Sequence, residues 1–242
     1  MSDPVSVLVV TGTGTGVGKT AVTAALAALG RAEGRRVAVL KPAQTGVGRD
    51  EPGDVDEVVR LAGDVTTREL RRYPDPLAPD VAARCSGIAP VGPVEAARAA
   101  TELDETHDLV LVEGAGGLLV RFDPEGATLA DVAWALSAPL LVVAQAGLGT
   151  LNATALTAEV ATARGLNVLG VVIGSWPARP DLAALCNVTD LPVAAGSPLL
   201  GALAEGAGGL DRFAFLEAAR AGLSPWFGGD FDADRFGKGL SS

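Results

Sequence analysis

The chain has 242 residues, of which 48% are hydrophobic and 20% are charged, and its formal charge at pH 7 is −10. This composition is typical of a globular protein with a full core and excludes a disordered chain. The 31 glycines and 15 prolines follow no short period, which excludes collagen-like and coiled-coil structures. The negative charge argues against phosphate backbones and anionic lipids as partners, so we expect neither nucleic-acid nor membrane binding.

Five short apolar runs are candidate strands, and helical patterns lie between them. Runs rich in Val and Leu that do not alternate with polar residues are typical of parallel strands covered on both faces. The strands are expected at Val5–Val10, Arg36–Leu40, Leu109–Val112, Pro139–Ala144 and Asn167–Ile173, and the helices at Lys19–Glu33, Val55–Ala62, Val94–Leu103, Leu129–Leu136, Leu151–Arg164 and Phe213–Ala221. This alternation predicts an α/β fold of the P-loop NTPase type, with a doubly wound, mostly parallel sheet and helices on both faces.

The domain organisation and the location follow from simple features of the chain. We expect a single domain over residues 1–223 and a loosely held, Gly/Asp/Ser-rich tail over residues 224–242. The two cysteines lie far apart, which argues against a disulfide framework or a zinc site, and the single histidine excludes a site built from several histidines. Because no membrane-length apolar run or signal-like start is present, we expect a cytoplasmic protein.

The first strong motif, TGTGTGVGKT over residues 11–20, directly follows the first predicted strand. Glycines in such a loop let backbone amides face phosphate oxygens, and the start of the next helix adds its positive dipole end. Lys19 is expected to reach the terminal phosphates, and the Thr20 hydroxyl is suited to Mg²⁺. Thr13 stands where the strict pattern has glycine. The expected nucleotide-binding residues here are Thr15, Gly16, Val17, Gly18, Lys19, Thr20 and Ala21.

A second motif places a carboxylate at the end of a predicted strand. Glu113 follows Leu109–Val112 and precedes Gly114, Ala115 and Gly116. Nucleotide-binding folds place the acid on the metal side at this position, and the glycines allow a ligand to approach the backbone closely. The alternative interpretation is a capping glutamate before a flexible turn.

The third motif, KPAQTG over residues 41–46, follows another predicted strand. Lys41 is one of only three lysines in the chain and is expected beside the phosphate loop, where a cation can neutralise a transferring phosphoryl group or a carboxylate. The alternative is a surface lysine before a turn. Two further positions have alternative interpretations on local sequence. Asp54 suits a helix N-cap and a second magnesium ligand about equally well. Leu148–Asn152 opens a helix and suits anion binding, but simple helix capping is the favoured interpretation on local sequence alone.

Taken together and in this order, these segments resemble the dethiobiotin synthetase family. The matching segments are Thr11–Thr20, Lys41–Gly46, Gly53–Asp54, Val112–Gly117 and Leu148–Asn152, with Gly174–Pro177 as a looser match. The resemblance implies an ATP- and Mg²⁺-dependent homodimer that condenses 7,8-diaminopelargonic acid with CO₂. In that reaction a carbamate attacks the ATP γ-phosphate, and the second amine then closes the cyclic urea of dethiobiotin with loss of phosphate.

The resemblance also implies roles for individual residues. Lys41 and Lys19 would be catalytic, and Thr20, Asp54 and Glu113 would surround magnesium. Substrate would contact Thr15, Lys41, Thr45 and, across the subunit interface, Gly149, Thr150, Leu151 and Asn152. Further nucleotide contacts would come from Gly174, Ser175, Ala204, Glu205 and Gly206.

One departure from the family pattern concerns the base of the nucleotide. The asparagine that reads adenine in the family is absent, because Ile173 is followed by Gly174 and Ser175, and the segment at Ala204 lacks the expected proline. We therefore predict weak discrimination between nucleotide bases.

Other P-loop proteins fit the sequence less well. Amide synthetases that take nitrogen from glutamine need an additional domain that this chain is too short to contain. Partition ATPases carry a signature lysine at the position of Gly14, and GTPase switches carry an Asn-Lys-x-Asp motif that surrounds none of the three lysines. These alternatives share the P-loop, so turnover that requires a small amine is the discriminating observation.

Overall fold

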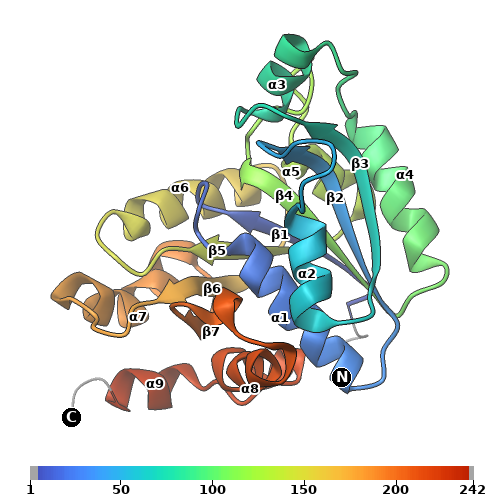
Figure 1. Ribbon diagram of the computed structural model, residues 1–242. Coiled ribbons are helices and arrows are strands. Elements are labelled where there is room, and N and C mark those ends of the chain that lie inside the picture. The colour runs from blue at the N-terminus through green and yellow to red at the C-terminus, as the bar shows by residue number, and fades with distance from the viewer. Residues whose placement is uncertain (1–4, 240–242) are drawn as a thin grey trace.

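A parallel sheet forms the centre of the computed structural model, which describes residues 5–239 (Figure 1). Within these residues the sheet has seven strands in the order β3-β2-β4-β1-β5-β6-β7, and every pairing is parallel. The strands are β1 (Val7–Gly12), β2 (Val37–Thr45), β3 (Thr66–Tyr73), β4 (Leu109–Gly117), β5 (Leu140–Ala144), β6 (Val168–Trp176) and β7 (Leu199–Ala204). The parallel α/β fold predicted from the sequence is therefore confirmed.

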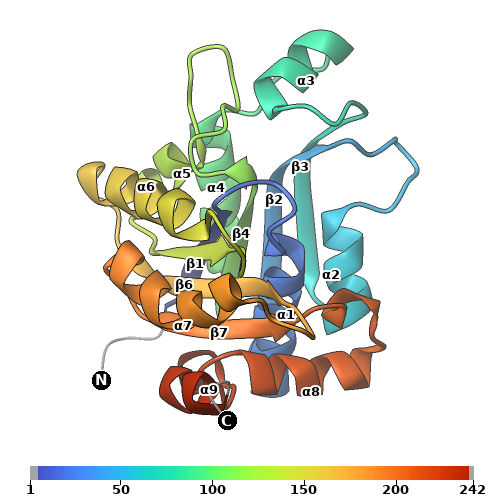
Figure 2. The ribbon, with the colours of Figure 1, turned by 90° about the vertical axis from the view of Figure 1, so that its left-hand side faces the viewer.

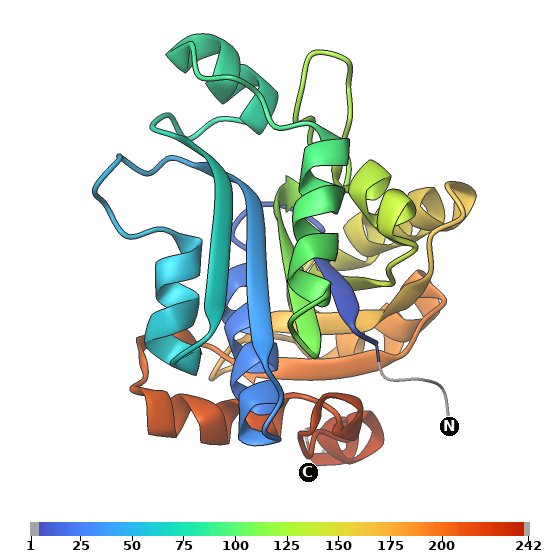
Figure 3. The same cartoon turned by 90° about the vertical axis from the view of Figure 1, so that its right-hand side faces the viewer.

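Helices cover both faces of this sheet, so each strand is buried on two sides (Figures 2 and 3). On one face, α1 (Lys19–Ala32), α2 (Asp54–Ala62) and α8 (Arg212–Gly222) pack on side chains such as Leu8 and Val10. On the other face, side chains such as Val9 and Val142 pack under the remaining large helices. These are α4 (Pro93–Asp104), α5 (Leu129–Leu136), α6 (Thr150–Ala163) and α7 (Leu182–Ala195).

Two elements lie outside this layered arrangement. Helix α3 (Pro79–Ser86) stands beyond the carboxyl end of β3, and α9 (Ala233–Gly239) packs against α7 and β7 (Figure 1). The part of the predicted tail that the structure describes, residues 224–239, is packed rather than loosely held. Phe231 is buried, and the Phe236 ring lies edge-on to Trp176 with 5.0 Å between ring centroids. Aromatic burial explains the departure from the composition-based expectation, and residues 240–242 lie outside the described residues.

Two strands and several helix boundaries were not predicted from the sequence. β3 has the sequence TTRELRRY and reads as a polar segment, because it is an edge strand that pairs with β2 alone among the described strands. β7 contains Gly201, which interrupts its apolar run. Helices α3 and α7 were also missed.

Within residues 5–239, no helix is long and apolar enough to cross a membrane.

The most consequential difference is that β2 continues to Thr45 instead of ending at Leu40. β2 pairs with β4 only as far as Leu40 and Val112, whereas its pairing with β3 runs from Ala38 to Thr45. Pro42, which has no N–H to donate, is tolerated in this half-paired part of the strand. Because β2 separates from β4 after Leu40, a crevice opens at the carboxyl ends of the strands. Ligands bind at this position in open α/β sheets.

Candidate active site

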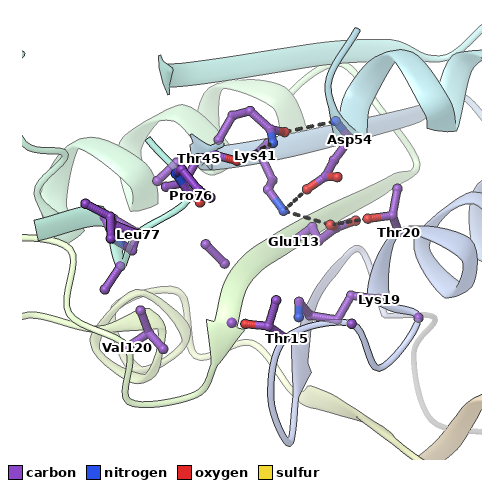
Figure 4. A pocket seen from close by; sticks show the side chains of 18 of the residues that line it. Thr15, Lys19, Thr20, Lys41, Thr45, Asp54, Pro76, Leu77, Glu113 and Val120 are labelled. Atoms are coloured by element: carbon purple, nitrogen blue, oxygen red, sulfur yellow. Dashed lines mark hydrogen bonds and ion pairs between the residues drawn. The ribbon is translucent and has the colours of Figure 1, made fainter. Parts of the chain in front are cut away.

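A cavity of about 600 Å³ opens at the carboxyl ends of β1, β2 and β4 (Figure 4). It collects residues from all three motifs that the sequence singled out. The predicted site residues that line it are Thr15, Gly16, Gly18, Lys19, Thr20, Ala21, Lys41, Thr45, Asp54, Glu113, Ala115 and Gly116.

The phosphate loop connects β1 to α1 with two glycines in the left-handed region. Gly16 has φ of 74° and Gly18, the N-cap of α1, has φ of 94°. Gly18 lies directly against the end of β6, because a Cβ added to it would be 2.5 Å from Gly174 O. A Cβ added to Gly174 would in turn be 2.0 Å from Val17 O. Glycine is therefore required on both sides of this contact, and the backbone of β6 supports the loop from behind.

Lys19 is held within the phosphate loop. Its Nζ donates to Gly14 O at 2.9 Å. Burial lowers the pKa of Lys19, and the positive charge of Lys41 lowers it further, although Glu113 and Asp54 partly offset both effects. The positive charge of Lys41 therefore lies close enough to Lys19 to repel its ammonium. An anion bound between the two lysines would relieve this repulsion.

Lys41 is buried between two carboxylates. Its Nζ lies 2.5 Å from Asp54 Oδ2 and 2.8 Å from Glu113 Oε1, and it also donates to Gly114 O at 3.1 Å. The Lys41 side chain is 3% exposed and that of Glu113 is 1% exposed, whereas Asp54 is 34% exposed toward the cavity. The alternative of a surface lysine is thus wrong. Glu113 is buried as well, which makes the alternative of a simple capping glutamate wrong.

The charges of this cluster favour the charged forms of Lys41 and Asp54. Burial lowers the pKa of Lys41, but the opposing charges of Glu113 and Asp54 outweigh burial and raise that pKa above its ordinary value. Burial raises the pKa of Asp54, but the Lys41 ammonium and a hydrogen bond with Thr20 outweigh it and hold that pKa below its usual range. Lys41 is therefore a stable cation at the cavity wall and is not poised to act as a base.

Asp54 is the first residue of α2 and not its N-cap. The N-cap is Gly53, whose N–H is accepted by Asp56 Oδ2 at 2.7 Å. The Asp54 carboxylate is consequently free to turn toward Lys41 (Figure 4). The capping alternative for Asp54 is wrong.

The oxygen donors in the cavity fit a magnesium ion. Thr20 Oγ1 donates to Glu113 Oε1 at 2.9 Å, and the Asp54 carboxylate approaches the same cluster through Lys41 and Thr20. Magnesium prefers oxygen ligands and is usually held by one or two carboxylates together with phosphate oxygens. Within residues 5–239, no three His, Cys, Asp or Glu side chains gather as a metal cage. Thr20, Asp54 and Glu113 therefore suit a magnesium ion that arrives with a nucleotide.

The remaining predicted residues lie apart from the described cavity lining. Val17 and Gly174 support the phosphate loop, and Gly114 contributes its carbonyl to Lys41. The α6 start has Gly149 as N-cap with φ of 91°, and the buried Thr150 hydroxyl has no hydrogen-bond partner among the described residues. Those that the structure does not bring to the cavity are Gly149, Thr150, Leu151, Asn152, Ser175, Ala204, Glu205 and Gly206.

The cavity also contains residues that the sequence did not predict. One wall is formed by residues 76–78, which connect β3 to α3, by Pro79 at the start of α3, and by Val120 after β4. These segments carry no recognisable motif and reach the cavity only through the fold. Gln44 lines the cavity too and lies within the third motif, so its position in that motif was a usable signal.

Comparisons with known proteins agree with this geometry. A family model described as an AAA domain matches residues 6–206. The ATP-dependent dethiobiotin synthetase BioD of Streptomyces coelicolor is 64% identical over 231 residues, which cover 96% of this chain and 97% of that protein. The enzyme of the same name from Saccharopolyspora erythraea is 67% identical over 224 residues, which cover 93% and 98% of the two chains.

A solved structure gives independent support for the fold. The cell division ATPase MinD of Pyrococcus furiosus superposes with a TM-score of 0.53 at 21% identity and covers 88% of each chain. At this identity the likeness shows the P-loop NTPase fold alone. Identity above 60% over nearly the full length of the two curated relatives settles the family. The chain belongs to the ATP-dependent dethiobiotin synthetase family.

Proposed function

We propose that this enzyme catalyses the ATP-dependent carboxylation and ring closure of 7,8-diaminopelargonic acid with CO₂ to give dethiobiotin. The observation that carries the proposal is the buried ammonium of Lys41, which faces the cavity beside the phosphate loop and is held by Asp54 and Glu113. A carbamate and a γ-phosphate are both anions, and a fixed cation between them would reduce their repulsion. Phosphoryl transfer needs positioning and charge neutralisation more than a protein nucleophile.

The proposed reaction has three steps. An amine of the substrate adds to CO₂ and loses a proton, which gives a carbamate. A carbamate oxygen then attacks the γ-phosphorus of ATP, ADP leaves, and a carbamic–phosphoric anhydride forms. The second amine attacks the carbonyl carbon of this anhydride and loses a proton, the ring closes to a urea, and phosphate leaves.

The phosphate loop and several polar side chains of the cavity have proposed roles in these steps. The amides of the phosphate loop and the Lys19 ammonium would hold the phosphates. Lys41 would face both the carbamate and the γ-phosphate, and Thr15 and Thr45 would contact the diamine. Thr20, Asp54 and Glu113 would hold Mg²⁺, which when bound neutralises charge on the phosphate oxygens.

We further propose that the enzyme is a homodimer in which the start of α6 serves the cavity of the partner subunit. In the part of the chain that the structure describes, Gly149–Asn152 do not line the cavity of their own subunit. A role in substrate binding therefore requires a second copy. The same region exposes Leu148, which is 90% exposed, and Leu156, which is 56% exposed. The described residues leave both leucines uncovered, so these side chains are available for burial against a second copy.

The overall reaction is tested by phosphate release from Mg-ATP and bicarbonate, with and without diaminopelargonic acid. Release that requires the diamine and is matched by dethiobiotin formation supports the proposal. Release that does not require the diamine would instead indicate a nucleotide switch. The absence of release would contradict an ATP-dependent reaction of this substrate.

The shared site is tested by mixing two inactive variants, Lys41→Met and Asn152→Asp. In a mixed dimer one cavity combines an intact Lys41 with an intact α6 start, so activity should return on mixing if substrate spans two subunits. If mixing restores no activity although co-purification through a tag on one variant shows mixed dimers, the shared-site proposal is wrong.

A further inference from the structure

The connection between β2 and α2 must place Asp54 beside Lys41, although much of this connection is exposed to solvent. Residues 49–52 are exposed, and only Gly53 is buried immediately before the helix. Because Gly53 is the N-cap, it offers no side chain to accept the first free N–H groups of α2. A helix start of this kind frays unless other groups satisfy its amides.

Gln44 supplies one such group from the neighbouring strand. Its Oε1 accepts the N–H of Asp54 at 2.9 Å, and its Nε2 donates to Thr45 O at 3.2 Å. The second bond fixes the orientation of the amide, so that its oxygen faces α2. Gln44 is 4% exposed, and a buried, fully oriented amide is a rigid support.

Arg72 of β3 holds the preceding loop. Its guanidinium is itself fixed by Glu69, with Nε 2.7 Å from Oε1 and Nη2 2.9 Å from Oε2. From this position Nη1 donates to Gly48 O at 3.2 Å and also to Glu51 O. A planar guanidinium can hold several acceptors in a fixed geometry, which an ammonium cannot do.

The two supports meet at Gly53. A Cβ added to Gly53 would lie 3.0 Å from Gln44 Oε1 and 3.0 Å from Arg72 Nη2. The amide and the guanidinium therefore lie together on the side of Gly53 where a side chain would stand, so that only glycine fits there, and the next residue is Asp54. In this arrangement Asp54 lies with its Oδ2 2.5 Å from Lys41 Nζ.

We propose that Gln44 and Arg72 are positioning residues that hold Asp54 in its place beside Lys41. They act on the reaction through Asp54 and do not take part in the chemistry themselves. The proposal rests on the proposed function, in which Asp54 helps to bind magnesium with the nucleotide. Supporting groups of this kind change metal affinity or activity by about 10- to 100-fold when they are removed.

The first test uses Gln44→Met, which keeps the length of the side chain and removes the acceptor, and Arg72→Lys, which keeps the charge and removes the fork. Arg71→Lys is the matched control, because Arg71 is the neighbouring residue and makes a similar two-bond pair with Glu95, at 3.0 Å for both bonds. We expect diamine-dependent turnover to fall about 10- to 100-fold in the first two variants and to change less than about threefold in the control.

A binding measurement separates positioning from general damage. Calorimetry should show weaker binding of Mg-ATP to Gln44→Met and Arg72→Lys, while binding of ATP in excess chelator stays close to that of the unchanged enzyme. In the Asp54→Asn background, adding Gln44→Met should cause little further loss, because effects that act through one group are not additive.

The outcomes distinguish the two proposals. If Asp54→Asn is strongly impaired while Gln44→Met and Arg72→Lys keep full turnover, the positioning proposal is wrong and the proposed function stands. An equal loss in Arg71→Lys, or a fully multiplicative loss in Asp54→Asn/Gln44→Met, also overturns positioning through Asp54. If Asp54→Asn itself is unimpaired, the metal-binding role of Asp54 is wrong, and so is the positioning role of Gln44 and Arg72 that depends on it.

Discussion

Replacing Lys41 by methionine tests the buried charge cluster most directly. Methionine has nearly the same length and volume but no charge, so the change removes the ammonium and leaves the shape of the site largely intact. Glu113 would then remain buried, at 1% exposure, with the Thr20 hydroxyl as a donor but without a positive partner. Lys41→Ala is expected to have the same catalytic effect with an additional cavity.

The size of the effect can be worked out from the exposure of the two carboxylates. Breaking a buried ion pair by removing one partner costs about 3–5 kcal/mol. Asp54 is 34% exposed and can regain water, so its share is discounted and the total should fall near the lower end, about 3 kcal/mol. For a protein of this length that loss lowers the melting temperature by roughly 6–12 °C. The variant should still fold, because domains are stable by about 5–15 kcal/mol.

A second variant separates stability from catalysis. Lys41→Met combined with Glu113→Gln removes the buried charge that the first change leaves unpaired. We expect the double variant to be more stable than Lys41→Met in urea unfolding, with an unchanged dependence on urea concentration. Turnover should stay at least about 100-fold below that of the unchanged enzyme in both variants, because the fixed cation is absent.

Two results would refute this reasoning. One is a Lys41→Met variant as stable as the unchanged enzyme, which would mean that burial of the Glu113 carboxylate does not require the Lys41 ammonium. The other is near-normal diamine-dependent phosphate release by Lys41→Met, which would remove Lys41 from the mechanism altogether.

Three further predictions concern the nucleotide. Lys19→Ala should raise the dissociation constant of ATP by at least about tenfold, or 1.4 kcal/mol, in calorimetry, as well as lowering turnover; unchanged ATP affinity would contradict its role. Gly174→Ala should weaken both folding and ATP binding, because its Cβ would be 2.0 Å from Val17 O, whereas Gly92→Ala, with no neighbour within 4 Å among described residues, should bind ATP normally. Competitive titration of the four common nucleotides should show weak preference, and a preference for ATP of about 100-fold, or 2.7 kcal/mol, would disprove weak base discrimination.

Much of the site was predictable because its motifs are local and the fold rule is general. The phosphate loop, Glu113 and Lys41 each follow an apolar run, and parallel strands bring their carboxyl ends to one edge of a sheet. Their convergence therefore follows from order along the chain. The wall formed by residues 76–79 was not predictable, because it depends on β3, a polar edge strand that hydrophobic patterning does not reveal.

The burial of Lys41 was not predictable from local sequence either. It depends on the place where β2 parts from β4, after Leu40 and Val112, and on the pairing of the following residues with β3. Both facts are properties of the sheet and not of the motif. The same holds for Asp54, since its sequence suits an N-cap and only the bond from Gly53 N–H to Asp56 shows that the cap lies one residue earlier.

The choice of lysine at position 41 follows from the acceptors around it. An ammonium has three N–H donors, and Lys41 Nζ has three oxygen partners, on Asp54, Glu113 and Gly114. The planar guanidinium of arginine is larger and presents its donors in one plane, so it cannot meet acceptors that surround a point. To contact a phosphoryl or carbamate oxygen, Lys41 must exchange one partner. The Gly114 carbonyl is neutral and most distant, at 3.1 Å, so it is the partner released at least cost, and the two carboxylates then keep the ammonium aimed at the cavity.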